Sequence, residues 1–314
     1  MPLHPTIEAL HQGMRQNPDS REMHELTPEE GRAAYRALGQ AFGPGPDLAR
    51  VEDRAAPGPA GDIPLRVYAP QSEGPLPVLV YYHGGGFVIG DLESHDRPCR
   101  ELCKAAGCLL VAVDYRLAPE HPFPAAVEDS LAALHWIADN ADELGGDPKR
   151  LAVGGDSAGG NLAAVMALLA RDGGPALRLQ LLVYPTVDRR IERYPSTEEN
   201  AEAPFLGKVT MEWFMGHYLG TAEVTEAHLD PRVSPLLADS HAGLPPALTL
   251  TAGFDPLRDQ GTAYHEALTG AGVDSTLHAF DNMPHAFFQL SGLVEEGKQA
   301  IAESAAALRA AFAD

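Results

Sequence analysis

One serine of the chain has the surroundings of a nucleophile. Ser157 is the centre of GDSAG at residues 155–159, a Gly-x-Ser-x-Gly motif between an apolar segment, residues 150–153, and a segment with leucines and alanines at helical spacing, residues 161–171. A serine on such a sharp strand-to-helix turn exposes its hydroxyl, and the two glycines let the strand and the helix approach closely. The motif also arises by chance in glycine-rich chains, so it gains weight only beside a second motif. With that support, it predicts acyl transfer through Ser157.

A run of three glycines supplies the second motif. HGGGF at residues 83–87 follows the strongly apolar segment 77–82, which we predict to be a strand. Glycines bring bare backbone N–H groups close to a ligand, here the oxygen that turns negative during acyl transfer. A flexible turn after the strand is the alternative interpretation. Both motifs follow strands, at the edge where open α/β sheets place their sites. The predicted oxyanion donors are the N–H groups of Gly84, Gly85, Gly86 and Ala158.

Longer motifs follow one another in a fixed order. They are YHGGGFVIG at 82–90, DYRLAPEHPFPAA at 114–126, GGDSAGGNL at 154–162 and DPLRD at 255–259, with HAF from residue 285. On these motifs the chain resembles the bacterial hormone-sensitive-lipase-like carboxylesterases of the α/β-hydrolase superfamily, over most of the chain from Val51 onward. Two departures are small: Ala286 stands where the family usually has glycine, and Gln260 stands where an acidic residue is common.

The resemblance implies a fold and an activity. The implied fold class is α/β, an α/β-hydrolase fold with a mostly parallel eight-stranded sheet flanked by helices and a helical cap. The implied activity is that of a serine carboxylesterase, which hydrolyses esters of short to medium acyl chains through an acyl-enzyme on a Ser-His-Asp triad. The expected partner is a small-molecule ester, and this chemistry needs neither a metal nor an organic cofactor.

The acid of the triad is expected after Ser157 and just beyond a strand, because α/β-hydrolases order their triad as serine, acid, histidine. Asp255 fits this place, since it follows an alternating segment, residues 247–253, that reads as a strand. Asp259 lies one helical turn further and is interpreted as a surface or capping charge. Asp188 also follows a predicted strand and stays open as a weaker competitor.

The base must be chosen among thirteen histidines, and position distinguishes one of them. His285 follows the last predicted strand, residues 275–280, on the loop where the superfamily places its histidine, so His285 is the predicted general base. His278 lies inside that strand and His83 belongs to the glycine loop, so both are interpreted as structural. Asp281, four residues before His285, is interpreted as a turn residue rather than as its partner.

The wider pattern of the chain predicts a doubly wound, mostly parallel sheet. Eight short apolar segments read as strands, and helical segments lie between the later ones. We assign residues 47–314 to the catalytic domain. The predicted strands are centred near Val51, Leu65, Val80, Leu110, Ala152, Leu181, Leu250 and Leu277.

Two regions outside this pattern are predicted to form a lid over the carboxyl ends of the strands. In residues 1–46, apolar residues recur at helical spacing, and residues 27–30 form a capping box that opens a second helix. The second region is an insertion at about residues 186–244. Bulky apolar side chains of the lid and the catalytic loops are predicted to line the substrate pocket, and the alternative for each is a place in the lid core. They are Phe87, Val88, Leu206, Trp213, Phe214, Met215 and Phe287.

Composition and charge exclude some functions. The 23 lysines and arginines stand against 44 aspartates and glutamates, and the net charge of −21 opposes binding to nucleic acid and to anionic membranes. No apolar run is long enough to span a membrane, and no signal-peptide pattern is present. The cysteines Cys99, Cys103 and Cys108 lack the spacing of a zinc site and are interpreted as free buried thiols. We expect a cytoplasmic protein, with a homodimer left open.

Other functions stay open on the motifs alone. The same triad cleaves amides or transfers acyl groups in other proteins, because fold and triad are shared across such chemistries. A non-enzymatic binding protein is disfavoured, since the plant gibberellin receptors that resemble this family lack the catalytic histidine, whereas this chain has His285. A lipase acting on insoluble triglyceride is disfavoured by the small lid without an obvious exposed apolar helix. The sequence does not identify the physiological ester.

Overall fold

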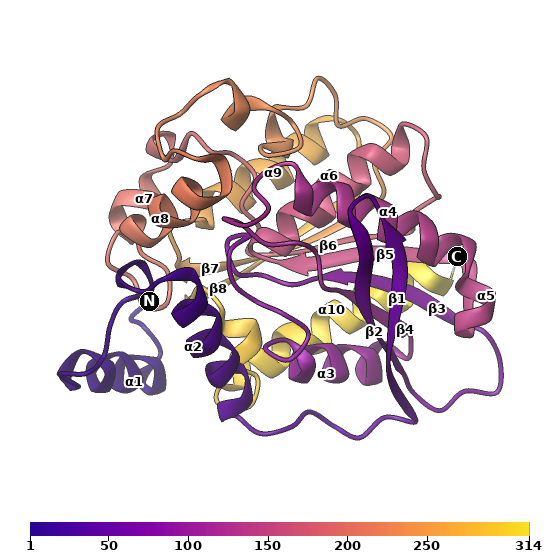
Figure 1. Cartoon of the computed structure of the whole chain (residues 1–314), viewed down its shortest axis with the longest axis horizontal. Helices are drawn as coiled ribbons and strands as arrows, with labels where there is room; N and C mark the ends of the chain where they lie inside the picture. Colours follow the sequence, from indigo (N-terminus) through magenta and orange to yellow (C-terminus); the bar gives the residue numbers. More distant parts are fainter. Residues whose placement is uncertain (314) are drawn as a thin grey trace.

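A single eight-stranded sheet forms the centre of the computed structural model, which describes residues 1–313 (Figure 1). The strand order is β1-β2-β4-β3-β5-β6-β7-β8, with antiparallel pairs only at β1–β2 and β2–β4. All eight predicted strands and the mostly parallel sheet are therefore confirmed. The strands are β1 Arg50–Gly58, β2 Gly61–Ala69, β3 Leu76–Tyr82, β4 Leu109–Val113, β5 Gly146–Asp156, β6 Gln180–Val183, β7 Ala247–Phe254 and β8 Ser275–Pro284.

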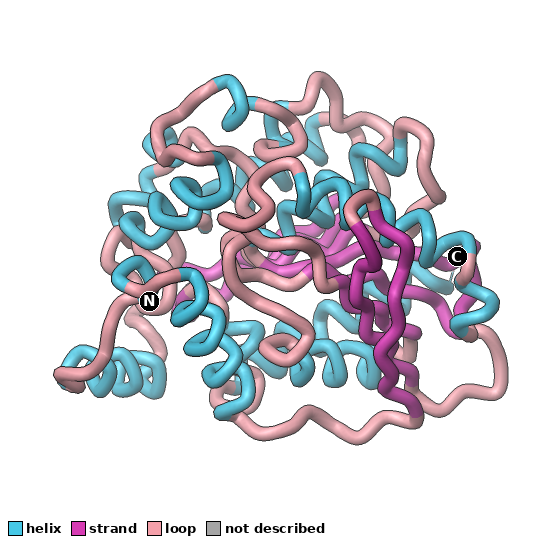
Figure 2. Tube along the Cα trace, viewed as in Figure 1, coloured by secondary structure: helices cyan, strands magenta, loops and turns pink. Residues whose placement is uncertain are grey.

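Helices cover both faces of the sheet, as Figure 2 shows. Because side chains alternate along a strand, Val78 and Val80 of β3 point into one apolar core and Leu79 and Tyr81 into the other. Helices α4, α6 and α9 contribute to the first core, and α3 and α10 contribute to the second. The helices of this layer are α3 Asp96–Ala106, α4 Ala125–Asp139, α5 Ala141–Leu144, α6 Ala158–Arg171, α9 Arg258–Gly270, η5 Phe287–Leu290 and α10 Glu295–Ala313.

The two regions outside the sheet pattern gather at one end of the molecule, on the left of Figure 1. In the N-terminal region the predicted capping box is present, since the Thr27 hydroxyl accepts from the N–H of Glu30 and the Glu30 carboxylate accepts from the N–H of Thr27. These regions contain α1 Pro5–Gln16, η1 Met23–Glu25, α2 Pro28–Ala41, η2 Ile191–Arg193, α7 Pro195–Glu199, α8 Lys208–Leu219, η3 Glu226–Leu229 and η4 Pro235–Leu237.

The three cysteines are buried and free, as predicted from their number and spacing. None of the helices within residues 1–313 is both long enough and apolar enough to cross a membrane. Over the same residues, no group of three or more histidine, cysteine, aspartate or glutamate side chains is arranged to hold a metal ion.

Candidate active site

Ser157 occupies the turn between β5 and α6. Its φ of 56° lies in the left-handed region that residues with a side chain rarely adopt, so the turn is strained. The flanking glycines are required by space, because a Cβ on Gly159 would collide with the carbonyl group of Tyr82. The N–H of Ser157 donates to the carbonyl of Val183 at 2.8 Å, which fixes the turn against the neighbouring strand. The local sequence thus holds the serine hydroxyl at the carboxyl edge of the sheet.

The side chains of Ser157, His285 and Asp255 form one continuous hydrogen-bonded chain. The Nε2 atom of His285 lies 2.9 Å from the Ser157 hydroxyl, and its Nδ1 atom lies 2.7 Å from Oδ2 of Asp255. Because a carboxylate only accepts, Nδ1 is the donor, and Nε2 of the neutral ring is free to accept the serine proton. The second Asp255 oxygen accepts from the N–H of Leu257 at 2.8 Å, and the carboxylate is fully buried. Asp255 directly follows β7 and His285 directly follows β8, the positions expected from the sequence.

The competing carboxylates lie in other interactions. Asp188 accepts from the guanidinium of Arg190 and, at 2.7 Å, from the hydroxyl of Tyr194. Asp259 accepts from the backbone N–H of Ser196 at 2.8 Å and forms an ion pair with Arg258 at 2.9 Å. These contacts leave Asp255 as the carboxylate that meets the imidazole.

The competing histidines are also engaged elsewhere. His278 is half-exposed on β8, and its Nδ1 atom contacts the carboxylate of Glu303. His83 stacks on Tyr115 with ring centroids 4.3 Å apart, and its Nδ1 atom donates to the carbonyl of Gly84 at 2.8 Å. Burial lowers the pKa of His83 to about 4, so this ring is neutral at pH 7. Both have the structural character predicted for them.

The structure shows what Ala286 and Gln260, the two departures from the family pattern, do in this chain. Ala286 adopts a φ of 66°, a left-handed conformation that glycine would adopt at lower cost. Gln260 is buried, and its side-chain carbonyl accepts from the N–H groups of Val187 and Asp188 at 2.9 and 3.0 Å. An oxygen acceptor is what an acidic residue would also supply there, so glutamine keeps the contact that holds the segment after β6.

The three glycines of the HGGG loop differ in what their N–H groups do. The N–H of Gly84 donates to Asp156 at 3.1 Å and lies 3.3 Å from Nε2 of His95, so it is already occupied. The N–H groups of Gly85, Gly86 and Ala158 have no partner within residues 1–313, and all three residues line the same cavity as Ser157. Positive φ angles of 117° and 60° at Gly85 and Gly86 explain why the loop needs glycine.

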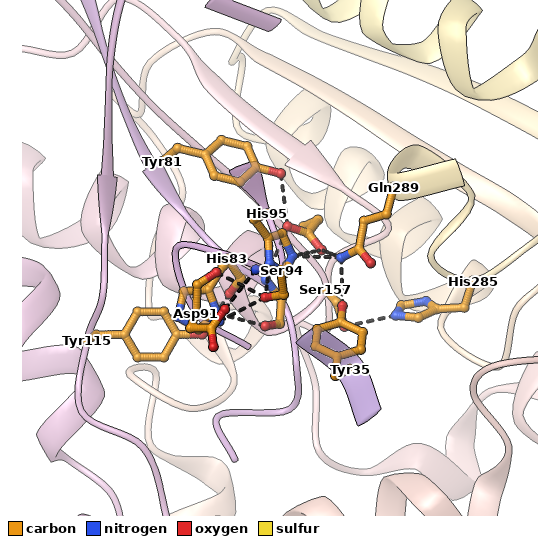
Figure 3. A network of polar contacts seen from close by, with 12 residues as sticks. Tyr35, Tyr81, His83, Asp91, Ser94, His95, Tyr115, Ser157, His285 and Gln289 are labelled. Atoms are coloured by element: carbon orange, nitrogen blue, oxygen red, sulfur yellow. Dashed lines mark hydrogen bonds and ion pairs between the residues drawn. The ribbon is translucent and has the colours of Figure 1, made fainter. Parts of the chain in front are cut away.

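A buried polar network supports this loop from behind, as Figure 3 shows. Asp156, directly before the nucleophile, accepts from the Tyr81 hydroxyl at 2.9 Å as well as from Gly84. The amide of Gln289 donates to Asp156 at 3.1 Å and to the hydroxyl of Tyr35 at 2.6 Å. Burial alone would raise the pKa of Asp156, but His95 and the hydrogen bond from the Tyr81 hydroxyl hold it below its ordinary value. The network connects α2 to the glycine loop, and no motif of the sequence indicates it.

A cavity of about 490 Å³ opens in front of Ser157, a size suited to a small molecule. Of the seven predicted pocket residues, Leu206, Phe214 and Met215 are among its lining residues. The other four are not among the lining residues within 1–313, because their side chains pack elsewhere or away from the opening. They are Phe87, stacked on Tyr218, Val88, Trp213 against Phe214 and His217, and Phe287 against Phe280 and Tyr184.

Both regions outside the sheet pattern contribute to the cavity wall. Residues of α1, α2 and the segment between them line the cavity together with residues of the insertion. Arg32 of α2 fixes this arrangement, since its guanidinium donates to the carbonyls of Val88 at 2.8 Å and Ala118 at 2.9 Å. The residues from the N-terminal region are His11, Met14, Arg21, Glu22, Met23, Leu26, Ala34, Tyr35, Ala37, Leu38 and Ala41.

Comparison with known proteins agrees with this geometry. Residues 79–289 match the family model of the alpha/beta hydrolase fold, and the chain is 49% identical over 271 residues to carboxylic ester hydrolase LipN of Mycobacterium tuberculosis. That alignment covers 83% of this chain and 71% of LipN. The chain belongs to the hormone-sensitive-lipase-like carboxylesterases of the α/β-hydrolase superfamily. The resemblance read from its motifs is confirmed.

Two further relatives extend the comparison. Carboxylesterase NlhH of Mycobacterium tuberculosis is 47% identical over 272 residues, which cover 85% of this chain and 84% of NlhH. The solved structure of ester-hydrolase EH1AB1, from the metagenome of Lake Arreo, superposes with a TM-score of 0.93 at 42% identity and covers 99% of this chain and 100% of that one. This α/β-hydrolase is therefore a carboxylesterase that acts on small-molecule esters.

Proposed function

We propose that this carboxylesterase hydrolyses esters of short to medium acyl chains through an acyl-enzyme on Ser157, His285 and Asp255. The supporting observation is the unbroken chain of hydrogen bonds from Asp255 through His285 to the Ser157 hydroxyl, at 2.7 and 2.9 Å. In this proposal His285 takes the serine proton as the hydroxyl attacks the ester carbonyl, then returns the proton to the leaving alcohol. Asp255 holds the ring and stabilises the imidazolium. Water then repeats the sequence and releases the acid.

The oxyanion that forms during attack would be bound by backbone N–H groups. We assign this role to Gly85, Gly86 and Ala158, because their N–H groups have no partner among residues 1–313 and the three residues border the cavity beside the serine. Each such donor contributes about 3 kcal/mol to transition-state binding. Gly84 is assigned a supporting role, since its N–H bond to Asp156 anchors the loop to the residue before the nucleophile.

A panel of p-nitrophenyl esters from two to sixteen carbons tests the proposed substrate class. We expect kcat/KM to peak at about eight carbons or fewer, as the resemblance to carboxylesterases of short to medium acyl chains implies. A peak at sixteen carbons would instead indicate a lipase. Faster turnover of an amide than of the matched ester would indicate an amidase.

We further propose that residues 1–46 and about 186–244 act together as a lid. Support comes from the cavity wall, to which both regions contribute, and from the hydrogen-bond distance of 3.2 Å between His24 and Thr210 across them. Arg32 ties the first region to the carbonyl of Val88, three residues after Gly85. A lid of this kind excludes water from the acyl-enzyme and limits the length of the acyl chain.

Filling the lid side of the cavity should shorten the preferred acyl chain. Ala34 lines the cavity, so Ala34→Trp is expected to lower kcat/KM for an eight-carbon ester by about tenfold relative to the acetate, through steric exclusion. Ala33, an exposed neighbour on the same helix and outside the wall, provides the matched control Ala33→Trp. If the two substitutions change the chain-length profile equally, α2 does not border the bound acyl chain.

The cytoplasmic location and the homodimer stay predictions from the sequence.

A further inference from the structure

Arg189 is a buried arginine in the wall of the substrate cavity. Only 6% of its surface is exposed, and it borders the same cavity as Ser157 and His285. The backbone of Arg189 is fixed by a hydrogen bond from its N–H to the hydroxyl of Ser234 at 3.0 Å. Its Nε and Nη2 atoms are fully buried and have no hydrogen-bond partner within residues 1–313. An arginine presents a fork of donors, and here part of that fork is unused.

The carboxylates nearby do not neutralise Arg189. The adjacent Asp188 is bound by Arg190 and Tyr194. Arg21, another arginine of the same cavity wall, differs because it is paired with Glu30 at 2.9 Å. Within residues 1–313, no carboxylate lies within salt-bridge distance of the Arg189 guanidinium.

The remaining neighbours of the guanidinium are polar but neutral, or aromatic. Its central carbon lies 5.4 Å from the centre of the Phe87 ring, a cation–π contact. The Tyr218 hydroxyl and Nε2 of His228 are also buried, and neither has a hydrogen-bond partner in the described part of the chain. Burial and the nearby Arg189 charge both lower the pKa of His228, so this ring is not a competing cation at neutral pH.

Arg189 keeps its charge at neutral pH. Burial lowers its pKa only to about 10. A buried cation without an anionic partner is costly, and an anion that reaches it recovers much of that cost through short, charge-assisted hydrogen bonds. The planar guanidinium fork matches the two oxygens of a carboxylate.

The position of Arg189 places such an anion close to the reaction. Phe87, under the guanidinium, directly follows Gly86 of the assigned oxyanion donors. The N–H of Thr186, three residues before Arg189, donates to the carbonyl of Ser157 at 3.4 Å. Through Phe87 and through its own backbone, Arg189 is therefore close in the chain and in space to the two segments that carry the oxyanion donors and the nucleophile.

We propose that Arg189 binds a free carboxylate of the substrate, so that the enzyme prefers esters with a carboxylate a few carbons from the scissile bond. This proposal rests on the proposed function, because Arg189 binds the carboxylate while the ester group of the same substrate lies at Ser157. The carboxylate belongs either to the acyl half, as in a half-ester of a short dicarboxylic acid, or to the alcohol half, as in an ester of a short hydroxy acid. The recognising chemistry is the same in both.

Two matched pairs of substrates distinguish a carboxylate on the acyl half from one on the alcohol half. Monoethyl glutarate and ethyl 4-carbamoylbutanoate differ only in a carboxylate against a neutral amide on the acyl side, and 3-carboxypropyl and 3-carbamoylpropyl butyrate differ in the same way on the alcohol side. We expect the wild-type kcat/KM to favour the carboxylate over the amide by about tenfold or more in one of the two pairs. No preference in either pair would overturn the proposal, and this measurement needs no variant.

Substitution of Arg189 tests the residue itself. Arg189→Met is expected to lower the carboxylate-to-amide ratio by about tenfold or more, mainly through KM, and Arg189→Lys is expected to lower it less because the charge remains. Arg178→Met, at a partly exposed arginine outside the cavity wall, is the matched control and should keep the wild-type ratio. An unchanged carboxylate-to-amide ratio in Arg189→Met would overturn the assignment, even if kcat/KM falls equally on both substrates. Absence of turnover of every ester by the wild type would instead contradict the proposed function.

Discussion

Replacing Ser157 by alanine is expected to lower kcat/KM for p-nitrophenyl esters by about 10⁴-fold or more while leaving Tm within a few degrees of the wild type. The hydroxyl is the proposed nucleophile, and alanine leaves no oxygen at its position. Its one hydrogen bond within the described residues goes to His285 at 2.9 Å, and alanine keeps the Cβ and the backbone of the turn. Initial rates and thermal denaturation of the two proteins measure the two expectations.

The control for this substitution is a serine outside the site. Ser72 is exposed and donates to the carbonyl of Gly74, so Ser72→Ala should leave both the rate and Tm unchanged. A purified Ser157→Ala protein that keeps more than about a hundredth of the wild-type rate would be incompatible with serine catalysis at this position.

Replacing Asp255 by asparagine is expected to lower kcat by about 10³-fold or more. The asparagine side chain is nearly the same size, but its amide group can donate where the carboxylate only accepts. Because Nδ1 of His285 lies 2.7 Å from Oδ2 of Asp255, this change favours the tautomer with the proton on Nε2, which cannot accept the serine proton. Steady-state kinetics with a saturating ester give kcat directly.

The matched control for this change is Asp188→Asn. Asp188 is equally buried and also follows a strand, but its partners are Arg190 and Tyr194. We expect this variant to lose stability, because an ion pair is broken in the interior, and to retain most of its kcat. The reverse pattern, with kcat lost in Asp188→Asn and kept in Asp255→Asn, would mean that the acid is wrongly assigned.

The features that the sequence predicted are those encoded over short stretches of chain. Alternating or continuous apolar runs marked all eight strands, including the central one from Leu76 to Tyr82. Ser157 could be predicted because the glycines around it are required locally, at positions where a Cβ would meet the backbone of β3. Asp255 and His285 could be predicted because the carboxyl ends of neighbouring parallel strands meet at one edge.

The features that the sequence did not reveal depend on contacts between distant residues. The hydrogen bond of Gln289 to Tyr35 joins residues 254 positions apart, and nothing near either residue indicates its partner. The Arg189 donors that lack a partner within residues 1–313 could not be predicted, because an arginine next to an aspartate, here Asp188, is usually interpreted as part of an exposed ion pair. Trp213 and Phe87 were predicted to line the pocket from their size, but the neighbours against which they pack are set by the tertiary structure.

Ala286, one of the two departures from the family motifs, keeps a backbone conformation that favours glycine. Glycine at position 286 would adopt the left-handed conformation more easily, yet Ala286 holds a φ of 66° because the segments on both sides of it are packed. The strain lies directly beside His285, where the fold fixes the ring against Tyr184, with ring centroids 4.5 Å apart. The surrounding packing, rather than the residue type alone, keeps the imidazole in line with the serine.

The central claim, that Ser157 is the nucleophile of an acyl-transfer triad, is tested most directly by covalent labelling with a p-nitrophenyl phosphonate followed by peptide mass spectrometry. The account predicts one phosphonate per chain, carried by Ser157, with release of one p-nitrophenolate, and no label in Ser157→Ala. In His285→Ala the rate of labelling should fall strongly, because the base is missing. Label on another residue, or labelling of Ser157→Ala at the wild-type rate, would contradict it.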